Sequence, residues 1–289
     1  MSVLERGSTI GGSSVRWSKG IWVKVFHILV FLIVGFCALF PLFWMVVSSF
    51  KAHADIVAMP MRFFPTKWIT DNYAKLLSGG AFSRSLLLTT GLGALFVIGT
   101  LIVNSMAGYA FARLEFPLKK VLWPMVLITM FIPGISILIT SFIVVVRLGM
   151  LNTIWVLILP GLASGGHIFF IRQFYLNFPL SLEEASMIDG CTRFQTYFRV
   201  FLPSSLPVFV IVGVSAFLGY WGSYLWPVMT ISKQSLYQIM QLMQFFRSER
   251  NLRDGVILAG AVITSIPPVV LFAIFQRYIV EGIKISGLK

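Results

Sequence analysis

The chain has 289 residues, of which 57% are hydrophobic and only 11% charged, with a mean hydropathy of +0.89 and a formal net charge of +13. About a quarter of the residues of a soluble domain are charged, and a soluble chain of this composition would expose large apolar patches. The composition therefore excludes a soluble globular protein and indicates a membrane protein. The basic residues do not form runs with interleaved aromatic residues, so a nucleic-acid-binding function is not expected.

Six stretches of the chain contain no Asp, Glu, Lys or Arg, and each is long enough to cross about 30 Å of hydrocarbon as a helix. A charge at the centre of such a helix costs about 2.5–3.5 kcal/mol on insertion scales. We therefore predict an all-α membrane protein with six transmembrane helices. The six stretches are Val25–Phe50, Ser85–Ala112, Val121–Val146, Leu148–Ile171, Val200–Ser232 and Gly255–Gln276.

An even number of spans places both termini on the same side of the membrane. Lys and Arg are slightly more frequent in the segments on that side, so the positive-inside rule favours cytoplasmic termini. The sequence predicts the following division of the chain. It comprises a disordered cytoplasmic N-terminus (1–20), a first transmembrane helix (21–50), an extracytoplasmic segment (51–84), a core of five transmembrane helices (85–281) and a cytoplasmic tail (282–289).

Proline and glycine interrupt three of the apolar stretches, at Pro133–Gly134, Pro160–Gly161 and Pro267–Pro268. Within a bilayer, such breaks persist only where neighbouring helices or water satisfy the freed backbone groups. We expect kinks at helix contacts or beside a transport path, and tolerated kinks without a gating role remain an equal alternative.

A polar stretch from Ser181 to Pro203 lies between the fourth and fifth spans, on the side of the termini. Ser181 stands three residues before Glu184, and Thr192 stands three residues before Gln195. Both pairs have the spacing of a capping box, in which the two side chains satisfy free backbone amides at the start of a helix. The stretch is therefore predicted to form two short helices.

Gly190 falls where a left-handed residue would end the first of these helices, and Pro203 is expected to end the second. A stiff, capped surface element can dock a partner protein, or it can lie as an amphipathic hairpin on the lipid headgroups. The residues alone leave both open, although acidic side chains beside an anionic leaflet favour a protein partner. The acidic residues are Glu183, Glu184 and Asp189.

This stretch also carries a resemblance to a known family. Glu184-Ala185-Ser186, then Gly190, then Val200-Phe201-Leu202-Pro203 resembles the EAA motif of ABC importer permeases, with Ser186 in place of the second Ala and Val200 in place of Ile. The run EEASMIDG is similar to the form found in MalG-like subunits of maltose-type carbohydrate importers. The segments AGYAFARLEFPLKK, WGSYLWPVMT and FQRYIVEGIKISGLK are also similar to that family, although Gly222 stands where the family usually has Asn.

The resemblance implies a type I ABC importer permease fold in the bacterial inner membrane. It makes the stretch Ser181–Pro203 a coupling element that docks on a separate ATPase subunit. Glu184 would pair with a cationic residue of that subunit, and Gly190 would permit the turn. The expected coupling residues are Glu183, Glu184, Ala185, Ser186, Asp189, Gly190, Leu202 and Pro203.

The implied partners are a second, MalF-like permease subunit, an ATPase homodimer, an extracytoplasmic solute-binding protein, a carbohydrate substrate and membrane lipid. ATP and Mg would be bound by the ATPase, because this chain has no G-x-x-x-x-G-K-[S/T] phosphate loop. No cofactor, metal site or catalytic residue is expected in this chain. The alternative function, an ion-coupled secondary transporter, would normally require acidic residues within the spans.

Five polar or amphipathic residues in the spans are candidates for a carbohydrate path, since aromatic faces stack on sugar rings and amides or hydroxyls bind their hydroxyl groups. Aromatic residues near a helix end are equally expected at the membrane interface. His27 and His167 are isolated on apolar spans and are expected to be packing or interface residues. The path candidates are Asn104, Tyr220, Trp221, Ser223 and Tyr224.

The extracytoplasmic segments 51–84 and 231–254 together hold nine Lys or Arg and four Asp or Glu, and nine minus four gives +5. Such a face would attract an anionic saccharide. Docking of an acidic binding protein and simple solvation of the charges are the alternatives.

Overall fold

The computed structural model describes residues 17–248 and 254–287, and all regular secondary structure in these ranges is helical. Three helices are each long and apolar enough to cross a membrane alone. They are α1 (Trp17–Ser49), α4 (Ala81–Arg113) and α15 (Asp254–Gly287).

Three further spans are each broken into two helical parts. The axes of the two parts differ by 108° in the first pair, 50° in the second and 78° in the third. With each pair taken as one span, the predicted six transmembrane segments are confirmed. The pairs are α5 (Lys119–Thr129) with α6 (Gly134–Arg147), α7 and η1 (Trp155–Ile158 and Leu159–Gly161) with α8 (Gly165–Leu176), and Arg193–Ser204 with α12 (Leu206–Gly222).

The proline positions account for two of these breaks. The first two pairs separate at Pro133–Gly134 and just after Pro160–Gly161, as the sequence predicted. Pro267 and Pro268, in contrast, lie within α15 without interrupting it. The fifth span also differs from expectation, because α12 ends at Gly222 and a separate short helix, α13 (Leu225–Thr230), follows.

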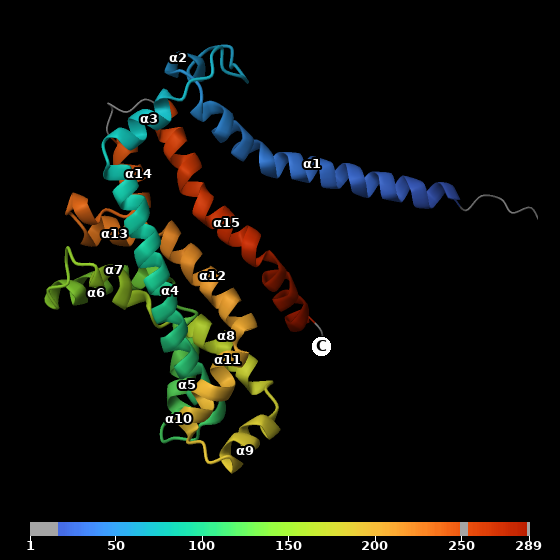
Figure 1. Ribbon diagram of the computed structural model, residues 1–289, viewed down its shortest axis with the longest axis vertical. Coiled ribbons are helices and arrows are strands. Elements are labelled where there is room, and N and C mark those ends of the chain that lie inside the picture. The colour runs from blue at the N-terminus through green and yellow to red at the C-terminus, as the bar shows by residue number, and fades with distance from the viewer. Residues whose placement is uncertain (1–16, 249–253, 288–289) are drawn as a thin grey trace, which may run out of the picture.

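The long helix α4 runs through the molecule, and α8 and α12 pack against it (Figure 1). α15 packs on α12, whereas α1 extends away from the other helices and approaches α15 through its C-terminal part. α1 buries only Val47, Ser48 and Ser49 of its side chains from Trp22 onward. The apolar surface of the rest of this helix is therefore left for lipid or another subunit to cover.

The two ends of the molecule carry different short helices (Figure 1). One end holds α2 (His53–Ile56), α3 (Asp71–Ser78) and α14 (Ile239–Ser248), and the turn η3 (Gln234–Leu236) lies beside α4. The other end holds α9 (Leu180–Ile188) and α10 (Arg193–Thr196), which continues through a π-helical turn (Tyr197–Phe201) into α11 (Leu202–Ser204).

The helix limits also differ from two of the predicted boundaries. α1 begins at Trp17, inside the segment 1–20 that was expected to be disordered, and residues 1–16 lie outside the described part of the chain. α15 continues to Gly287 through most of the expected tail 282–289, whose last two residues are also outside the described ranges.

Candidate functional site

The first helix of the coupling element begins differently from the prediction. α9 starts at Leu180 after Pro179, and no side chain caps its N-terminus. Ser181 therefore lies within the first turn of the helix, where its hydroxyl cannot occupy the capping position. The predicted capping box of Ser181 and Glu184 is wrong for this reason.

The turn between the two helices is built as predicted. Gly190 has a φ of +78°, and a Cβ built on it would meet nothing within 4 Å. The amide of Cys191 donates to the carbonyl of Ser186 (3.0 Å), and the amide of Gly190 donates to that of Met187 (3.0 Å). These two bonds form a Schellman cap, which requires a left-handed residue at position 190.

The second helix of the element starts with the predicted capping box. The amide of Gln195 donates to Thr192 Oγ1 (3.3 Å), and the amide of Thr192 donates to Gln195 Oε1 (2.8 Å). Pro203 does not end this helix, which continues to Ser204 and bends at Ser205. A π-helical turn precedes Pro203, and the change of hydrogen-bond register there accommodates a residue that has no amide proton.

Glu183 faces the interior of the element and is only 5% exposed. Its carboxylate accepts a hydrogen bond from Arg193 Nη1 and lies 3.7 Å from Arg113 Nη1. Arg113 is the last residue of α4, and its guanidinium also donates to the carbonyl of Tyr175 in α8 (2.6 Å). Glu183 thus joins both helices of the element to two transmembrane helices.

Aromatic residues anchor the second helix of the element in the core. The hydroxyls of Tyr197 and Ser105 lie 2.7 Å apart, and Tyr109 donates to the carbonyl of Arg193 (3.1 Å). The ring of Phe201 is fully buried, with its centroid 4.9 Å from that of Tyr109. Because Ser105 and Tyr109 belong to α4, these contacts join the second helix of the element directly to that helix.

The predicted coupling residues therefore divide into two groups. Glu183 and Ser186 are buried, and Ser186 joins the two short helices through a 2.9 Å contact between its hydroxyl and that of Thr196. Leu202 is half-buried. The exposed members are Glu184, Ala185, Asp189, Gly190 and Pro203.

Exposed apolar side chains accompany these outward-facing residues. Ile188 is 86% exposed and Phe194 is 60% exposed. Within the described residues, neither Glu184 nor Asp189 takes part in an ion pair. The outward surface of the element therefore combines unpaired carboxylates with apolar side chains, a composition suited to contact with another protein.

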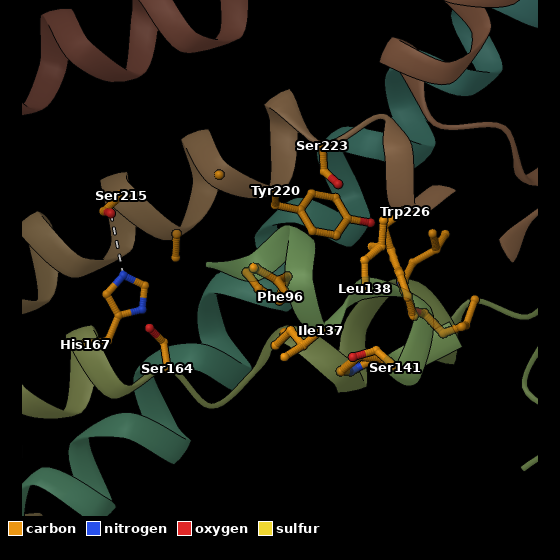
Figure 2. Close-up of a pocket in the computed structure, with 17 residues that line it drawn as sticks. Phe96, Ile137, Leu138, Ser141, Ser164, His167, Ser215, Tyr220, Ser223 and Trp226 are labelled. Carbon is orange, nitrogen blue, oxygen red and sulfur yellow. Dashed lines mark hydrogen bonds between the residues drawn. The ribbon is translucent and has the colours of Figure 1, made fainter. Parts of the chain in front are cut away.

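A second candidate site is a cavity of about 530 Å³ bordered by α6, α7, η1, α8 and α12, with Phe96 of α4 and Trp226 of α13 (Figure 2). Of the five predicted path residues, Tyr220 and Ser223 line it. The hydroxyl of Tyr220 donates to Gln238 Oε1 (3.0 Å), which fixes the position of the ring. Cavities with apolar walls and a few polar groups are the usual form of small-molecule sites.

The other three predicted path residues do not line this cavity. Asn104 is fully buried, donates to the carbonyl of Leu162 (2.7 Å) and accepts from the amide of Ser164 (2.8 Å). It thereby satisfies the backbone at the break between η1 and α8. Trp221 is also buried and donates to the carbonyl of Thr264 (3.2 Å), whereas Tyr224 is half exposed.

Several cavity residues were not among the predicted path residues. His167 and Ser215 lie together at one end of the cavity, with Nε2 and Oγ 3.5 Å apart (Figure 2). A signal was present in the sequence, because Ser215 and Gly219 are four residues apart on one face of α12, and Ser223 follows at the same interval directly after the helix ends. The other polar members are Ser141 and Ser164.

The comparisons with known proteins agree with this architecture. Residues 104–285 match the family described as binding-protein-dependent transport system inner membrane component. The chain belongs to this family. It is accordingly a transport component and a multi-pass protein of the inner membrane.

Curated relatives match the permease over most of its length. The trehalose transport system permease protein SugB of Mycobacterium tuberculosis is 32% identical over 263 residues, which cover 89% of this chain and 94% of the relative. The arabinooligosaccharides transport system permease protein AraQ of Halalkalibacterium halodurans is 28% identical over 262 residues, 90% of this chain and 94% of the relative.

A solved structure shares the fold of the permease. A crystal structure of a bacterial ABC transporter involved in the import of the acidic polysaccharide alginate superposes on it with a TM-score of 0.82. The match covers 91% of this chain and 98% of that chain at 19% sequence identity. The two chains therefore share the same fold.

The segment after α1 shows that the permease exposes less positive charge there than its composition suggests. Lys51 is fully buried, donates to the carbonyl of Arg62 (2.8 Å) and lies 3.8 Å from the centroid of the Trp44 ring. Burial lowers the pKa of Lys51. Arg62 in turn pairs with Asp55 (2.8 Å). In the other predicted extracytoplasmic segment, 231–254, three of the charged residues lie outside the described residues: Glu249, Arg250 and Arg253.

Proposed function

We propose that this chain is a permease subunit of an ATP-driven, binding-protein-dependent carbohydrate importer and that it couples to a separate ATPase through Ser181–Pro203. The observation that carries the proposal is the division of the coupling element into a buried and an outward face. Glu183 is held by Arg113 and Arg193, whereas Glu184, one residue further, is exposed without an ion-pair partner in the described chain. Such an arrangement leaves Glu184 available to a cationic residue of the ATPase.

The assembly would contain a second, MalF-like permease, an ATPase homodimer and an extracytoplasmic solute-binding protein. ATP and Mg would be held by the ATPase, and this chain would perform no chemistry of its own. Both termini would be cytoplasmic, on the same side as the coupling element. The membership of a binding-protein-dependent transport family supports this set of partners.

A carbohydrate substrate is supported by the names of the relatives, which include permeases for trehalose and arabinooligosaccharides. Anionic substrates also occur among them, as in the sn-glycerol-3-phosphate transport system permease protein UgpE of Rhizobium meliloti. The sequence-based expectation of an anionic sugar stays a prediction.

The proposed mechanism is mechanical. Closure of the ATPase subunits would move the coupling element as a rigid body, because its turn and its second helix are both capped. Tyr197 and Phe201 would carry the motion into α4 and α8 through the buried contacts described above. Rearrangement of these helices would open the path to each side of the membrane alternately.

Charge reversal at Glu184 tests the coupling. Glu184→Lys should leave the importer assembled in the membrane but reduce uptake at least about tenfold, because it brings like charges together at the docking surface. Glu115→Lys makes the same change on a carboxylate that is 91% exposed in the loop after α4, and it should transport normally. Wild-type uptake by Glu184→Lys, or an intact importer purified without an ATPase subunit, would overturn the assignment.

A further inference from the structure

We propose that the cavity between α6, α8 and α12 binds an uncharged saccharide ring, with His167, Ser215 and Ser223 as hydrogen-bonding residues. The inference rests on the proposed function, since it assigns part of the transport path to this chain. Figure 2 shows His167 and Ser215 at one end of the cavity and Tyr220, Ser223 and Trp226 at the other.

The lining of the cavity selects for an uncharged, hydroxyl-rich ligand. None of the 17 described residues that border it is Asp, Glu, Lys or Arg. An anionic group entering this part of the spans would lose its hydration without gaining a countercharge from this chain, so this inference runs against the sequence-based expectation of an anionic sugar. Hydroxyl groups, in contrast, can exchange hydrogen bonds with the serine side chains.

His167 is incompletely satisfied within the protein. Its Nδ1 is buried and has no hydrogen-bond partner in the described part of the chain, and its Nε2 makes only the 3.5 Å contact with Ser215. A polar group held in this way inside a span costs free energy unless another group completes its hydrogen bonds. The 3.5 Å separation leaves no room for a ligand atom between Nε2 and Ser215 Oγ, so a saccharide hydroxyl would bond to either group from the cavity and replace their long contact.

The opposite end of the cavity offers flat apolar surface whose position is fixed. Trp226 Nε1 donates to the carbonyl of Val156 (2.8 Å), and Tyr220 donates to Gln238, so neither polar group needs the ligand. The rings remain available for contact with the apolar face of a sugar. Between the two ends, a Cβ on Gly219 would meet nothing within 4 Å, so this part of the wall borders open space.

Gly219 provides a test at a position where the wall of the cavity has space. Gly219→Leu would place a side chain in the cavity, because a Cβ at this position meets nothing within 4 Å, and a helix interior favours Leu over Gly. Gly91→Leu is the matched control. Gly91 lies within α4, and a Cβ added to it would also meet nothing within 4 Å, but this residue does not line the cavity.

The measurements use the importer purified intact through a tag on this chain and reconstituted in liposomes together with its solute-binding protein. The probes are radiolabelled trehalose, lactose and arabinotriose, and ATP hydrolysis is measured in parallel. We expect Gly219→Leu to reduce uptake at least about tenfold while ATP hydrolysis and assembly persist, and Gly91→Leu to leave both unchanged. His167→Gln, which keeps a hydrogen-bonding side chain, should retain more uptake than His167→Leu.

Each contrary result is informative. Unchanged uptake in Gly219→Leu, or equal losses in Gly219→Leu and Gly91→Leu, would overturn the assignment of the cavity. If the wild-type importer in liposomes hydrolyses ATP but imports none of the three sugars, the proposal that the ligand is an uncharged saccharide would be contradicted, and the proposed function would stand. A purified assembly without ATP hydrolysis would instead contradict the proposed function itself.

Discussion

The carboxylate of Glu183 lies 3.7 Å from the guanidinium of Arg113, the residue at which α4 ends. Both side chains are only 7% exposed, so the pair is almost entirely removed from water. Buried charges in this position are stable only while they remain paired and hydrogen-bonded. The contact therefore holds the coupling element at a fixed position relative to the transmembrane helices.

Removal of the Glu183 carboxylate should destabilise the protein strongly. Glu183→Ala leaves Arg113 buried without its countercharge, and breaking a buried pair costs about 3–5 kcal/mol. The free energy of unfolding, measured by SDS titration of the purified importer in mixed micelles, should fall by about this amount. Glu115→Ala removes an exposed pair with Lys119 and should cause no measurable change. Equal stability of the two variants would contradict the anchoring role of Glu183.

A side chain at Gly190 should loosen the turn of the coupling element. Gly190→Ala must adopt the left-handed backbone (φ +78°), which costs about 1–2 kcal/mol, although the Cβ itself meets no neighbour. The rate at which a membrane-impermeant maleimide modifies the adjacent, half-buried Cys191 should rise. Gly79→Ala is the control, because Gly79 has a φ of −81° and should tolerate Ala without strain. An unchanged rate in Gly190→Ala would show that the turn does not depend on glycine.

Substitution of Asn104 should affect stability rather than sugar selectivity. Asn104→Leu leaves the carbonyl of Leu162 and the amide of Ser164 without partners at the break before α8. Because both hydrogen bonds are only partly buried, the two unsatisfied groups should cost at most about 2–6 kcal/mol together. Thr90→Val, which removes one hydrogen bond on an exposed face of the same helix, is the control. A stable Asn104→Leu importer with altered substrate preference would instead place Asn104 in the transport path.

The stability of the loop after α1 should depend on pH only under acidic conditions. Hydrogen bonds from the Thr66 hydroxyl (2.5 Å) and amide (2.9 Å), followed by Arg62, hold the pKa of Asp55 below its ordinary value of 3.8. Because the folded pKa is the lower one, the stabilisation is present above pH 3.8 and is lost as the pH falls through the folded pKa. Hydrogen-exchange protection of the Thr66 amide should follow this course. Asp55→Asn should remove the dependence, and protection that declines between pH 7 and 5 would contradict it.

Local patterns in the sequence were sufficient to predict part of the structure of the coupling element. The cap at Thr192 and the turn at Gly190 were predicted correctly, because each depends on residues within five positions along the chain. The cap at Ser181 was wrong, although its spacing was equally good, because Pro179 moves the start of α9. Pro203 was expected to end a helix, but the helix continues one residue further, to Ser204, after a π-helical turn.

The cavity was predicted only in part. Of the path candidates, Tyr220 and Ser223 line it, whereas His167 was expected to be a packing residue. Like Ser223, Asn104 and Trp221 are polar or amphipathic residues within the predicted spans. Their side chains, however, donate hydrogen bonds to backbone carbonyls elsewhere in the fold. No local signal distinguishes a polar side chain that completes the backbone from one that faces a cavity.

The sequence by itself determined the membrane class, the six apolar segments and the caps at Gly190 and Thr192. These features follow from the cost of charge in hydrocarbon and from contacts within one or two helical turns. Only the tertiary structure decided that Glu183 faces inward and that His167 meets Ser215. The reason is physical, since the residues that fix these orientations, such as Ser105 with Tyr197 at a separation of 92 positions, come together only when the helices pack.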